Sequence, residues 1–202
     1  MTSTTLTPAA ERIVHVALLH FADRGYDAAS LNDIAGSAGI KKASLYAHFS
    51  GKDELYTAVL TLALQSEQAY VSGQFSTTQA NQAPGERYVD NLQGRYAESA
   101  ALRFLLRAAF YPPAAIEQNV KSGFERYLDD IRRLFQASLK DTYPAFEQKH
   151  TDLLAEAYLA LIDSLNVELI YGDEAAYARR FDALRELFGM IYLPLVRGNA
   201  PE

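Results

Sequence analysis

The sequence predicts an all-α protein, in which a three-helix domain with a helix-turn-helix precedes a larger helical body. Apolar residues recur at the three- and four-residue spacing of helices throughout the chain, and no segment shows the alternation that is typical of strands. Glycines and prolines interrupt this pattern at intervals suited to helices. With 202 residues, of which 49% are hydrophobic and 22% charged, the chain is long enough to bury a core without disulfide bonds.

The N-terminal part divides into three helical segments. Pro8 suits the first turn of the first helix, and Gly25 supplies a C-terminal stop for it. Ser30 is a favourable N-cap for a second, short helix, and a third is expected over residues 42–49. Two short helices around a glycine-containing turn, after a supporting helix, are typical of a helix-turn-helix. We therefore predict such a domain over residues 8–55.

The rest of the chain, residues 56–197, is predicted to form the helical body. A long helix should follow Gly51, and the polar segment 72–85 is expected to be a loop. The remaining helices are predicted at residues 86–99, 100–110, 114–140, 146–171 and 174–195.

The composition excludes several kinds of site. There are no cysteines, which rules out disulfides, thiolate metal sites and cysteine nucleophiles. His15 and His20 are five residues apart and His150 stands alone, so these histidines do not have metal-ligand spacing. We find no serine–histidine–aspartate spacing, paired catalytic carboxylates or glycine-rich phosphate loop, and we predict no enzyme activity, no cofactor and no metal.

The charge and hydropathy limit the possible partners. No secretory signal is recognisable at residues 1–10, and the longest uncharged apolar stretch, residues 56–66, is far shorter than the ~20 residues that span a bilayer. We expect a cytoplasmic, soluble protein without membrane contacts. The formal net charge is −6, and the first 56 residues are themselves slightly acidic. Because nucleic-acid-binding proteins usually carry a basic surplus, any DNA binding must depend on a few well-placed groups.

One segment resembles a known family. Residues 21–60 contain, in this order, RGYDAASLNDIA, AGI and LYAHFSGKDEL, and their spacing resembles the N-terminal DNA-binding domain of the TetR family of bacterial transcriptional regulators. The body resembles the family only in the number and lengths of its helices. The resemblance implies a sequence-specific transcriptional repressor that a small-molecule effector releases from a palindromic, double-stranded DNA operator.

The first turn of the third helix should lie nearest the base edges, because a recognition helix enters the major groove with its N-terminal residues. Lys42 can donate to guanine, Ser44 can bond to a base or a phosphate, and Ala43 can contact a thymine methyl group. Lys41 stands where the family usually has a Ser or Thr cap, which leaves this helix uncapped at a cost of about 1 kcal/mol. Lys41 is either a phosphate contact or a solvated lysine.

The resemblance implies further DNA contacts around this turn. Tyr46 and His48 would contact phosphates or the groove edge, and Lys52 would bind a phosphate at the start of the following helix. Ser30 is expected to cap its helix and to contact the phosphate backbone, and Asn32 suits adenine. The alternatives are that Tyr46 is a packing tyrosine and that His48 is solvated or a satisfied core group.

We also expect a homodimer, because one DNA-binding domain touches few phosphates, whereas two of them about one helical turn of DNA apart, roughly 34 Å, bind together. The last two helices are long and broadly apolar, and two such helices from each copy would form a four-helix interface. The predicted interface residues are Leu161, Leu165, Leu169, Leu184, Leu187, Phe188, Ile191 and Leu195. The alternative is that these side chains only form the core of one chain.

The middle helices are rich in aromatic residues, in the region where members of the family usually hold an effector pocket. We expect a hydrophobic or aromatic small molecule there, oriented by polar side chains. The candidate ligand residues are Tyr96, Phe104, Phe124, Tyr127, Asp163 and Asn166. Aromatic residues at helical spacing also form ordinary cores. The alternative function is a DNA-binding protein of the same fold whose body binds a protein partner instead of a small ligand.

Overall fold

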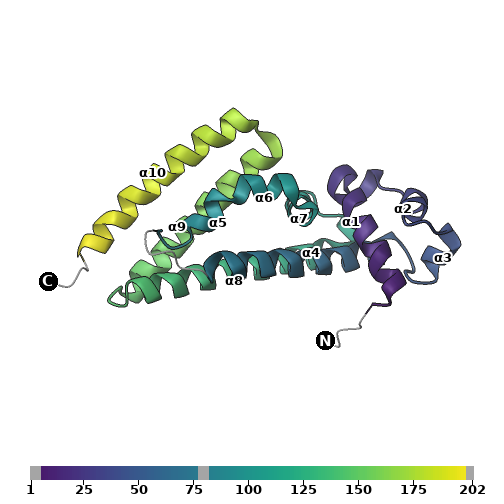
Figure 1. Ribbon diagram of the computed structural model, residues 1–202, viewed down its shortest axis with the longest axis horizontal. Coiled ribbons are helices and arrows are strands. Elements are labelled where there is room, and N and C mark those ends of the chain that lie inside the picture. The colour runs from purple at the N-terminus through teal and green to yellow at the C-terminus, as the bar shows by residue number, and fades with distance from the viewer. Residues whose placement is uncertain (1–5, 77–81, 199–202) are drawn as a thin grey trace. The chain divides into compact units, whose positions relative to one another are not determined.

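Figure 1 shows the computed structural model, which describes the backbone of residues 6–76 and 82–198 and, within these ranges, the side chains as far as residue 192. The described residues are helical without any strand, so the all-α prediction is confirmed. No helix among them is long and apolar enough to cross a membrane. The helices are α1 (Pro8–Ala28), α2 (Leu31–Ser37), α3 (Lys42–Tyr46), α4 (Lys52–Phe75), α5 (Glu86–Asp90), α6 (Leu92–Glu98), α7 (Ala100–Phe110), the 3₁₀ turn η1 (Ala114–Ile116), α8 (Glu117–Thr142), α9 (Gln148–Tyr171) and α10 (Glu174–Gly198).

The chain packs as two compact units. Unit 1 comprises Met1–Glu67 and Tyr96–Glu125, and unit 2 comprises Gln68–Arg95 and Arg126–Glu202. The long helices α4 and α8 each contribute residues to both units. Unit 1 therefore contains α7 in addition to the predicted helix-turn-helix domain. The division into a DNA-binding domain over residues 8–55 and a body over residues 56–197 stays a prediction.

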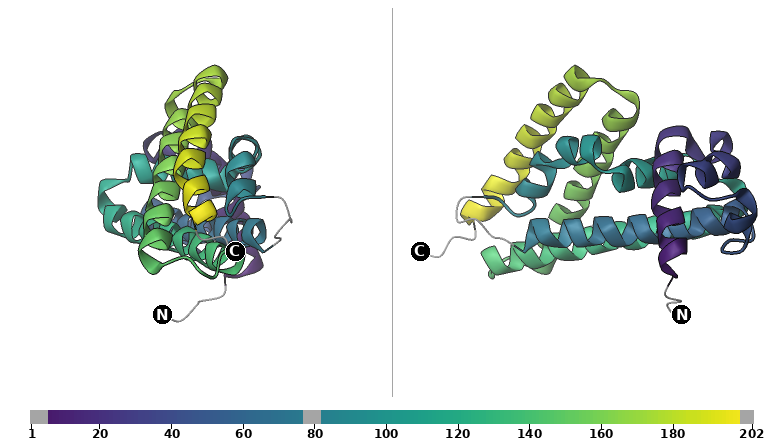
Figure 2. Two further views of the ribbon diagram at one scale, coloured as in Figure 1. Left: turned by 90° about the vertical axis from the view of Figure 1, so that its left-hand side faces the viewer. Right: turned by 45° about the vertical axis from the view of Figure 1, so that its right-hand side comes forward.

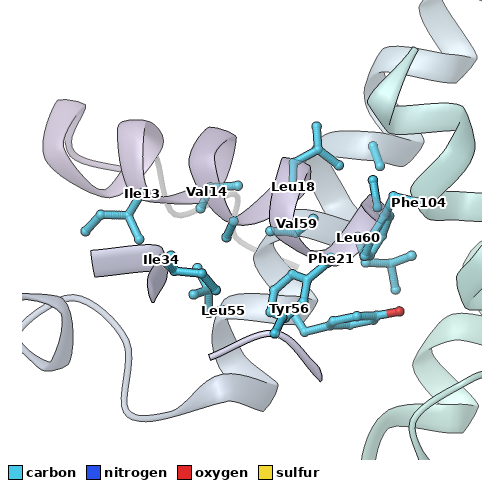
Figure 3. Packing of buried hydrophobic residues seen from close by; sticks show 14 of the residues in the cluster. Ile13, Val14, Leu18, Phe21, Ile34, Leu55, Tyr56, Val59, Leu60 and Phe104 are labelled. Carbon is cyan, nitrogen blue, oxygen red and sulfur yellow. The ribbon is translucent and has the colours of Figure 1, made fainter. Parts of the chain in front are cut away.

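An aromatic cluster lies in the core of unit 1. The ring of Phe21 on α1 meets the ring of Tyr56 on α4 edge-on, with 4.9 Å between centroids, and the ring of Phe104 on α7 lies 4.8 Å from Tyr56. Figure 3 shows these three buried side chains side by side. Burying a Phe side chain contributes about 1.5–3 kcal/mol. Helix α7 is thus part of the core that supports the helix-turn-helix domain, and the first helix of this domain, α1, is drawn in purple in Figure 2.

Arg107 of α7 binds the end of α1. Its Nε donates to the carbonyl of Ala22 over 3.0 Å, and its Nη2 donates to the carbonyl of Asp23 over 3.4 Å. The helical backbone is interrupted at Gly25, where φ is +74° and ψ is −179°. The last carbonyls of the preceding turn therefore need other partners, and a guanidinium also complements the negative end of the helix dipole. The helix stop predicted at Gly25 is thus an interruption within α1, which continues to Ala28.

In unit 2, Tyr158 of α9 fixes the residue before α5. Its ring stacks on Phe135 of α8 with 4.2 Å between centroids, and its hydroxyl donates to the carbonyl of Gly85 over 2.8 Å. Gly85 has φ +77°, and a Cβ atom at this position would lie 2.6 Å from the Tyr158 ring. Glycine is required here both for the left-handed conformation and for the close approach of the ring.

Some predicted boundaries differ from the structure. Helix α4 continues to Phe75, so the first four residues of the predicted loop are helical. Helix α3 ends at Tyr46 and not at residue 49. The single helix predicted over residues 86–99 is divided at Asn91, whose side chain donates to the carbonyl of Arg87 over 2.8 Å. Side chains that bond to the local backbone favour helix ends over helix interiors.

We expect the substitution Gly85→Ala to lower the free energy of unfolding by about 2–3 kcal/mol, because a left-handed alanine costs about 1–2 kcal/mol and its methyl group displaces the Tyr158 ring. Urea denaturation followed by circular dichroism measures this change. The control is Gly94→Ala on α6, where a Cβ atom has no neighbour within 4 Å. There, alanine should raise stability by up to about 1 kcal/mol. Equal stabilities of the two variants would contradict the packing described for Gly85.

Candidate nucleic-acid interface

Backbone hydrogen bonds fix the turn between α2 and α3. The amide of Gly39 donates to the carbonyl of Gly36, and the amide of Ile40 donates to the carbonyl of Ala35, both over 3.0 Å. Gly39 has φ +69°. These features form a Schellman motif, which ends a helix and redirects the chain. Helix α3 begins shortly after this motif, so α2, the turn and α3 have the geometry of a helix-turn-helix.

The segment from Lys41 to Phe49 separates apolar from polar side chains. Leu45 and Phe49 are buried in the same core as Ile34 of α2. The exposed candidates for DNA contact are Lys41, Lys42, Ala43, Ser44, Tyr46 and His48. His48 is exposed and is therefore not a core residue. Its contact with DNA stays a prediction.

Tyr46 and Lys42 form a pair on the exposed face of α3. The Tyr46 side chain is 48% exposed, and the Nζ atom of Lys42 lies 5.9 Å from the centroid of its ring. The two residues are four positions apart and therefore neighbours on the helix surface. A cation above an aromatic ring is stabilised by about 0.5–1 kcal/mol at exposed sites. The pair thus offers an ammonium and a hydroxyl group to the same surface.

Helix α3 lacks a side-chain cap. Lys41 occupies the N-cap position with an extended backbone, at φ −76° and ψ 148°, and its side chain makes no capping hydrogen bond. The expectation that α3 has no side-chain cap is confirmed. The first turn of α3 thus lacks the stabilisation of a side-chain cap, which weakens a helix of only five residues.

Lys52 is tied into unit 1. Its Nζ donates to the carbonyl of Asp27 over 3.2 Å and lies 4.4 Å from the centroid of the Tyr26 ring. Burial lowers the pKa of Lys52, although Asp27 and Asp53 favour its charged form. Burial also raises the pKa of Tyr26 to about 12, together with the hydrogen bond that its hydroxyl donates to Asp53. Sequence reasoning missed this cluster, which joins the start of α4 to the last turn of α1.

Polar contacts also fix α2. The Oγ atom of Ser30 accepts a hydrogen bond from the amide of Asn32 over 3.2 Å, so the predicted cap is confirmed. The Asn32 side chain is exposed. The guanidinium of Arg24 donates to the carboxylate of Asp33 over 3.3 Å. Helix α2 therefore presents Asn32 from a backbone that is held at its N-terminus.

The six predicted ligand residues are divided between the two units. Phe104 belongs to the core of unit 1, and Tyr96 and Phe124 are partly buried in the same unit. In unit 2, the hydroxyl groups of Tyr127 and Tyr88 are hydrogen-bonded at 3.0 Å.

The remaining two candidates lie on α9. Asp163 is exposed, and partial burial of its carboxyl group raises its pKa. Asn166 is buried, and its Oδ1 atom has no hydrogen-bond partner among the described residues. Within the described residues, no cluster of His, Asp or Glu is arranged to hold a metal ion.

The predicted dimer residues differ in exposure. Leu161 and Leu165 of α9 are buried within one chain, and Leu165 has no exposed surface to offer a second copy. The partly buried members are Leu169, Leu184 and Phe188. Leu187 and Ile191 of α10 are exposed, whereas the side chain of Leu195 lies outside the described residues.

Other apolar side chains of α9 and α10 are exposed besides the predicted interface residues. On α9, Leu153 and Val167 are exposed fourteen residues apart, and the small Ala160 lies exposed midway between them. On α10, Met190 is exposed beside Leu187. The seven-residue spacing on α9 keeps its three positions on one face of the helix. Each of the two helices therefore has an exposed apolar stripe, which the sequence pattern alone could not separate from its buried one.

Comparison with known proteins places the N-terminal segment in a family. Residues 13–59 match the family described as "Bacterial regulatory proteins, tetR family". The biofilm operon icaADBC HTH-type negative transcriptional regulator IcaR of Staphylococcus epidermidis is 46% identical over 46 residues, which are 23% of this chain and 25% of IcaR. The HTH-type transcriptional activator FasR of Mycolicibacterium smegmatis is 32% identical over 115 residues, 55% of this chain and 51% of FasR. The chain thus matches between a quarter and a half of the length of these relatives.

Solved structures share the fold over nearly the whole chain. A transcriptional regulator from Rhodococcus superposes with a TM-score of 0.68 at 22% identity, covering 92% of this chain and 96% of its own. A regulator from Aquifex aeolicus has a TM-score of 0.64 at 23% identity, covering 91% and 99%. AibR, solved in complex with isovaleryl coenzyme A and operator DNA, has a TM-score of 0.59 at 16% identity, covering 90% and 97%.

The fold and the α2–α3 geometry define a helix-turn-helix protein with an all-helical body. The match over residues 13–59 assigns this N-terminal segment to the TetR family of bacterial regulatory proteins, and the curated relatives agree with this assignment. The resemblance drawn from the sequence motifs is confirmed.

We expect Lys41→Ser to raise the free energy of unfolding by about 1 kcal/mol, because a serine hydroxyl at an extended N-cap can accept from the first turn of α3. Lys41→Ala removes the same charge without adding a cap and serves as the control. Thermal and urea unfolding of both variants measure the difference. Equal stability of the serine and alanine variants would show that α3 gains nothing from a side-chain cap.

Proposed function

We propose that the protein is a sequence-specific DNA-binding regulator of transcription. The observation that carries this proposal is the division of the segment from Lys41 to Phe49, which buries Leu45 and Phe49 and exposes the polar side chains between them. A helix that follows a helix-turn-helix turn and exposes its N-terminal residues can place them in a major groove. Lys42 and Ser44 are suited to base edges, and Tyr46 to a phosphate or the groove edge.

The charge balance supports specific over general binding. The net charge of −6 gives no basic field to attract DNA over a distance. Lys52 is engaged by the carbonyl of Asp27 and the ring of Tyr26, so it offers only its remaining N–H groups to a phosphate. Lys41 and Lys42 are the exposed cations of α3, and binding depends on their placement together with that of the neighbouring polar groups.

We propose that the protein acts as a homodimer. The exposed apolar side chains of α9 and α10, such as Val167, Leu187 and Met190, support this assignment. Contiguous exposed apolar surface on a protein usually marks an interaction site, and a two-fold interface uses the same face on both copies. Two copies would also double the few DNA contacts that one domain can make.

We propose that the protein represses transcription. We also propose that it acts in the bacterial cytoplasm, where the DNA lies. IcaR is named a negative regulator, and FasR is named an activator. The DNA-binding segment therefore does not determine whether transcription is repressed or activated. Repression requires only that a bound dimer occupies the operator. A small-molecule effector that binds the body and lowers operator affinity would complete the function, and AibR, which was solved with a small ligand and DNA, supports this addition. We assign no enzyme activity.

The first test of this function is operator binding. On a duplex selected from a random library, Lys42→Ala should cost about 1–3 kcal/mol and relax specificity at one base position, and Tyr46→Phe should weaken binding to all sequences alike. Fluorescence anisotropy at several salt concentrations measures both effects. Lys149→Ala on α9, which removes an exposed lysine far along the sequence from α3, is the control. Unchanged binding by both α3 variants would contradict the assignment of the interface.

Dimerisation is tested by charge substitution on the exposed apolar stripes of α9 and α10. Leu187→Glu combined with Val167→Glu should produce a monomer, because two carboxylates would be buried without partners in the interface. Size-exclusion chromatography with light scattering gives the mass. Leu19→Glu, which changes an equally exposed leucine on α1, should leave the dimer intact. A wild-type protein that is monomeric at all concentrations tested would refute the proposal.

A further inference from the structure

Unit 2 contains a cavity of about 200 Å³ between α5 with the residues just before it, α9 and α10. None of the ligand residues predicted from the sequence lines it. Its walls are mainly apolar and include the aromatic side chains Tyr158, Phe181, Phe188 and Tyr192. Ligand pockets for drug-sized molecules usually measure ~300–1,000 Å³, so this cavity suits a smaller molecule.

The aromatic wall is fixed by contacts among its own rings. Tyr158 stacks on Phe135, and Phe188 meets both of these rings edge-on, at 6.3 Å and 6.2 Å between centroids. Tyr192 stacks on Phe188 at 6.0 Å. Stacked and edge-to-face rings of this kind hold one another in place. The ring faces and edges around the cavity are therefore ordered before any ligand arrives.

Three charged side chains line the same cavity, and they leave an acidic excess. The Nη2 atom of Arg185 donates to Oε1 of Glu86 over 2.8 Å, and Oε2 of Glu86 accepts from the amide of Ala83 over 2.9 Å. Asp90 lies four residues after Glu86, so both carboxylates project from one face of α5. Among the described residues, Asp90 has no hydrogen-bond or ion-pair partner. Partial burial raises its pKa against the effect of Arg185, and Glu86 raises it further.

One positively charged side chain of the protein already lies at the cavity wall, between a carboxylate and an aromatic ring. The guanidinium carbon of Arg185 lies 6.0 Å from the centroid of the Phe181 ring while its nitrogen binds Glu86. A cation is thus already held between a carboxylate and an aromatic ring. Aromatic faces attract cations and repel anions, and Arg185, the cation lining this cavity, is neutralised by Glu86.

We propose that this cavity binds a compact organic cation, namely a substituted ammonium joined to a small apolar or aromatic body, with Asp90 as its counter-ion and the aromatic wall around the apolar part. The proposal rests on the proposed function only in treating this ligand as the effector. The binding itself depends on Asp90, on the aromatic wall and on the space beside Gly189. An anionic ligand would have to displace Glu86 from Arg185 and would lie beside Asp90.

The test uses the full-length protein and three probes of similar size: phenyltrimethylammonium, its neutral isostere tert-butylbenzene, and phenylacetate. In isothermal titration calorimetry, the cation should bind about tenfold more tightly than the neutral isostere, and phenylacetate should bind more weakly than both. Phenylacetate binding as tightly as the cation, or no binding of any probe, would overturn the proposal.

Two variants separate charge from space. Asp90→Asn should remove most of the preference for the cation and leave tert-butylbenzene binding unchanged. Gly189→Leu should abolish binding of both, because Gly189 lines the cavity and a Cβ atom there has no neighbour within 4 Å, which leaves room for a larger side chain at the cavity wall. Gly94→Leu, in a similarly open position on α6 outside the cavity, is the matched control. Full cation binding by the Gly189→Leu protein, folded by circular dichroism, would place the ligand elsewhere.

The same proteins distinguish this inference from the proposed function. Operator binding by a protein that binds no probe would overturn the cavity assignment alone. Cation binding by a protein without operator affinity would support the cavity and contradict the regulator. When both hold, saturating phenyltrimethylammonium should weaken operator binding by the wild type and not by Gly189→Leu. An equal loss in both proteins would show that the effect arises outside this cavity.

Discussion

The burial of Phe21, Tyr56 and Phe104 in one aromatic cluster is the interaction on which the DNA-facing surface depends. Helices α2 and α3 have seven and five residues, far below the ~12–15 residues at which isolated helices become marginally stable in water. They persist because Ile34, Leu45 and the other buried residues join the core that this cluster anchors. Arg107 strengthens the same core by binding the end of α1. The recognition surface is therefore ordered by tertiary packing and only weakly by its own helices.

The acidic chain makes the placement of each polar group on α3 decisive. A protein with a basic surface gains affinity from counter-ion release at any DNA sequence, but the present chain has a net charge of −6. One of its cations, Lys52, is largely engaged within unit 1, where it joins the start of α4 to the last turn of α1. Lys41 remains exposed where a cap would have stabilised α3. Lys41 therefore lowers the stability of α3 relative to a capping residue, but it places a positive charge on the exposed surface.

Short-range signals were enough to predict most of the helix-turn-helix. The interruption at Gly25, the cap at Ser30 and the burial of Leu45 and Phe49 follow from residues within one or two turns. Contacts between distant segments gave no such signal. Tyr26 and Asp53 are 27 residues apart, and Arg107 is 85 residues from Ala22. The aromatic residues of the middle helices were also ambiguous. Their helical spacing shows that they lie on the apolar face of a helix, but it does not show whether that face packs in a core or lines a cavity.

Helix α10 links the two proposals for unit 2. Phe181, Arg185 and Phe188 line the cavity, whereas Leu187 and Met190 are exposed. A ligand that changes how α10 packs against α5 and α9 must also change the face that a second copy would contact, and the linkage is reciprocal, so dimerisation alters ligand affinity by the same factor. A ligand with equal affinity for both arrangements would shift nothing. An effector must therefore contact α10 together with α5 or α9, and the lining of this cavity meets that condition.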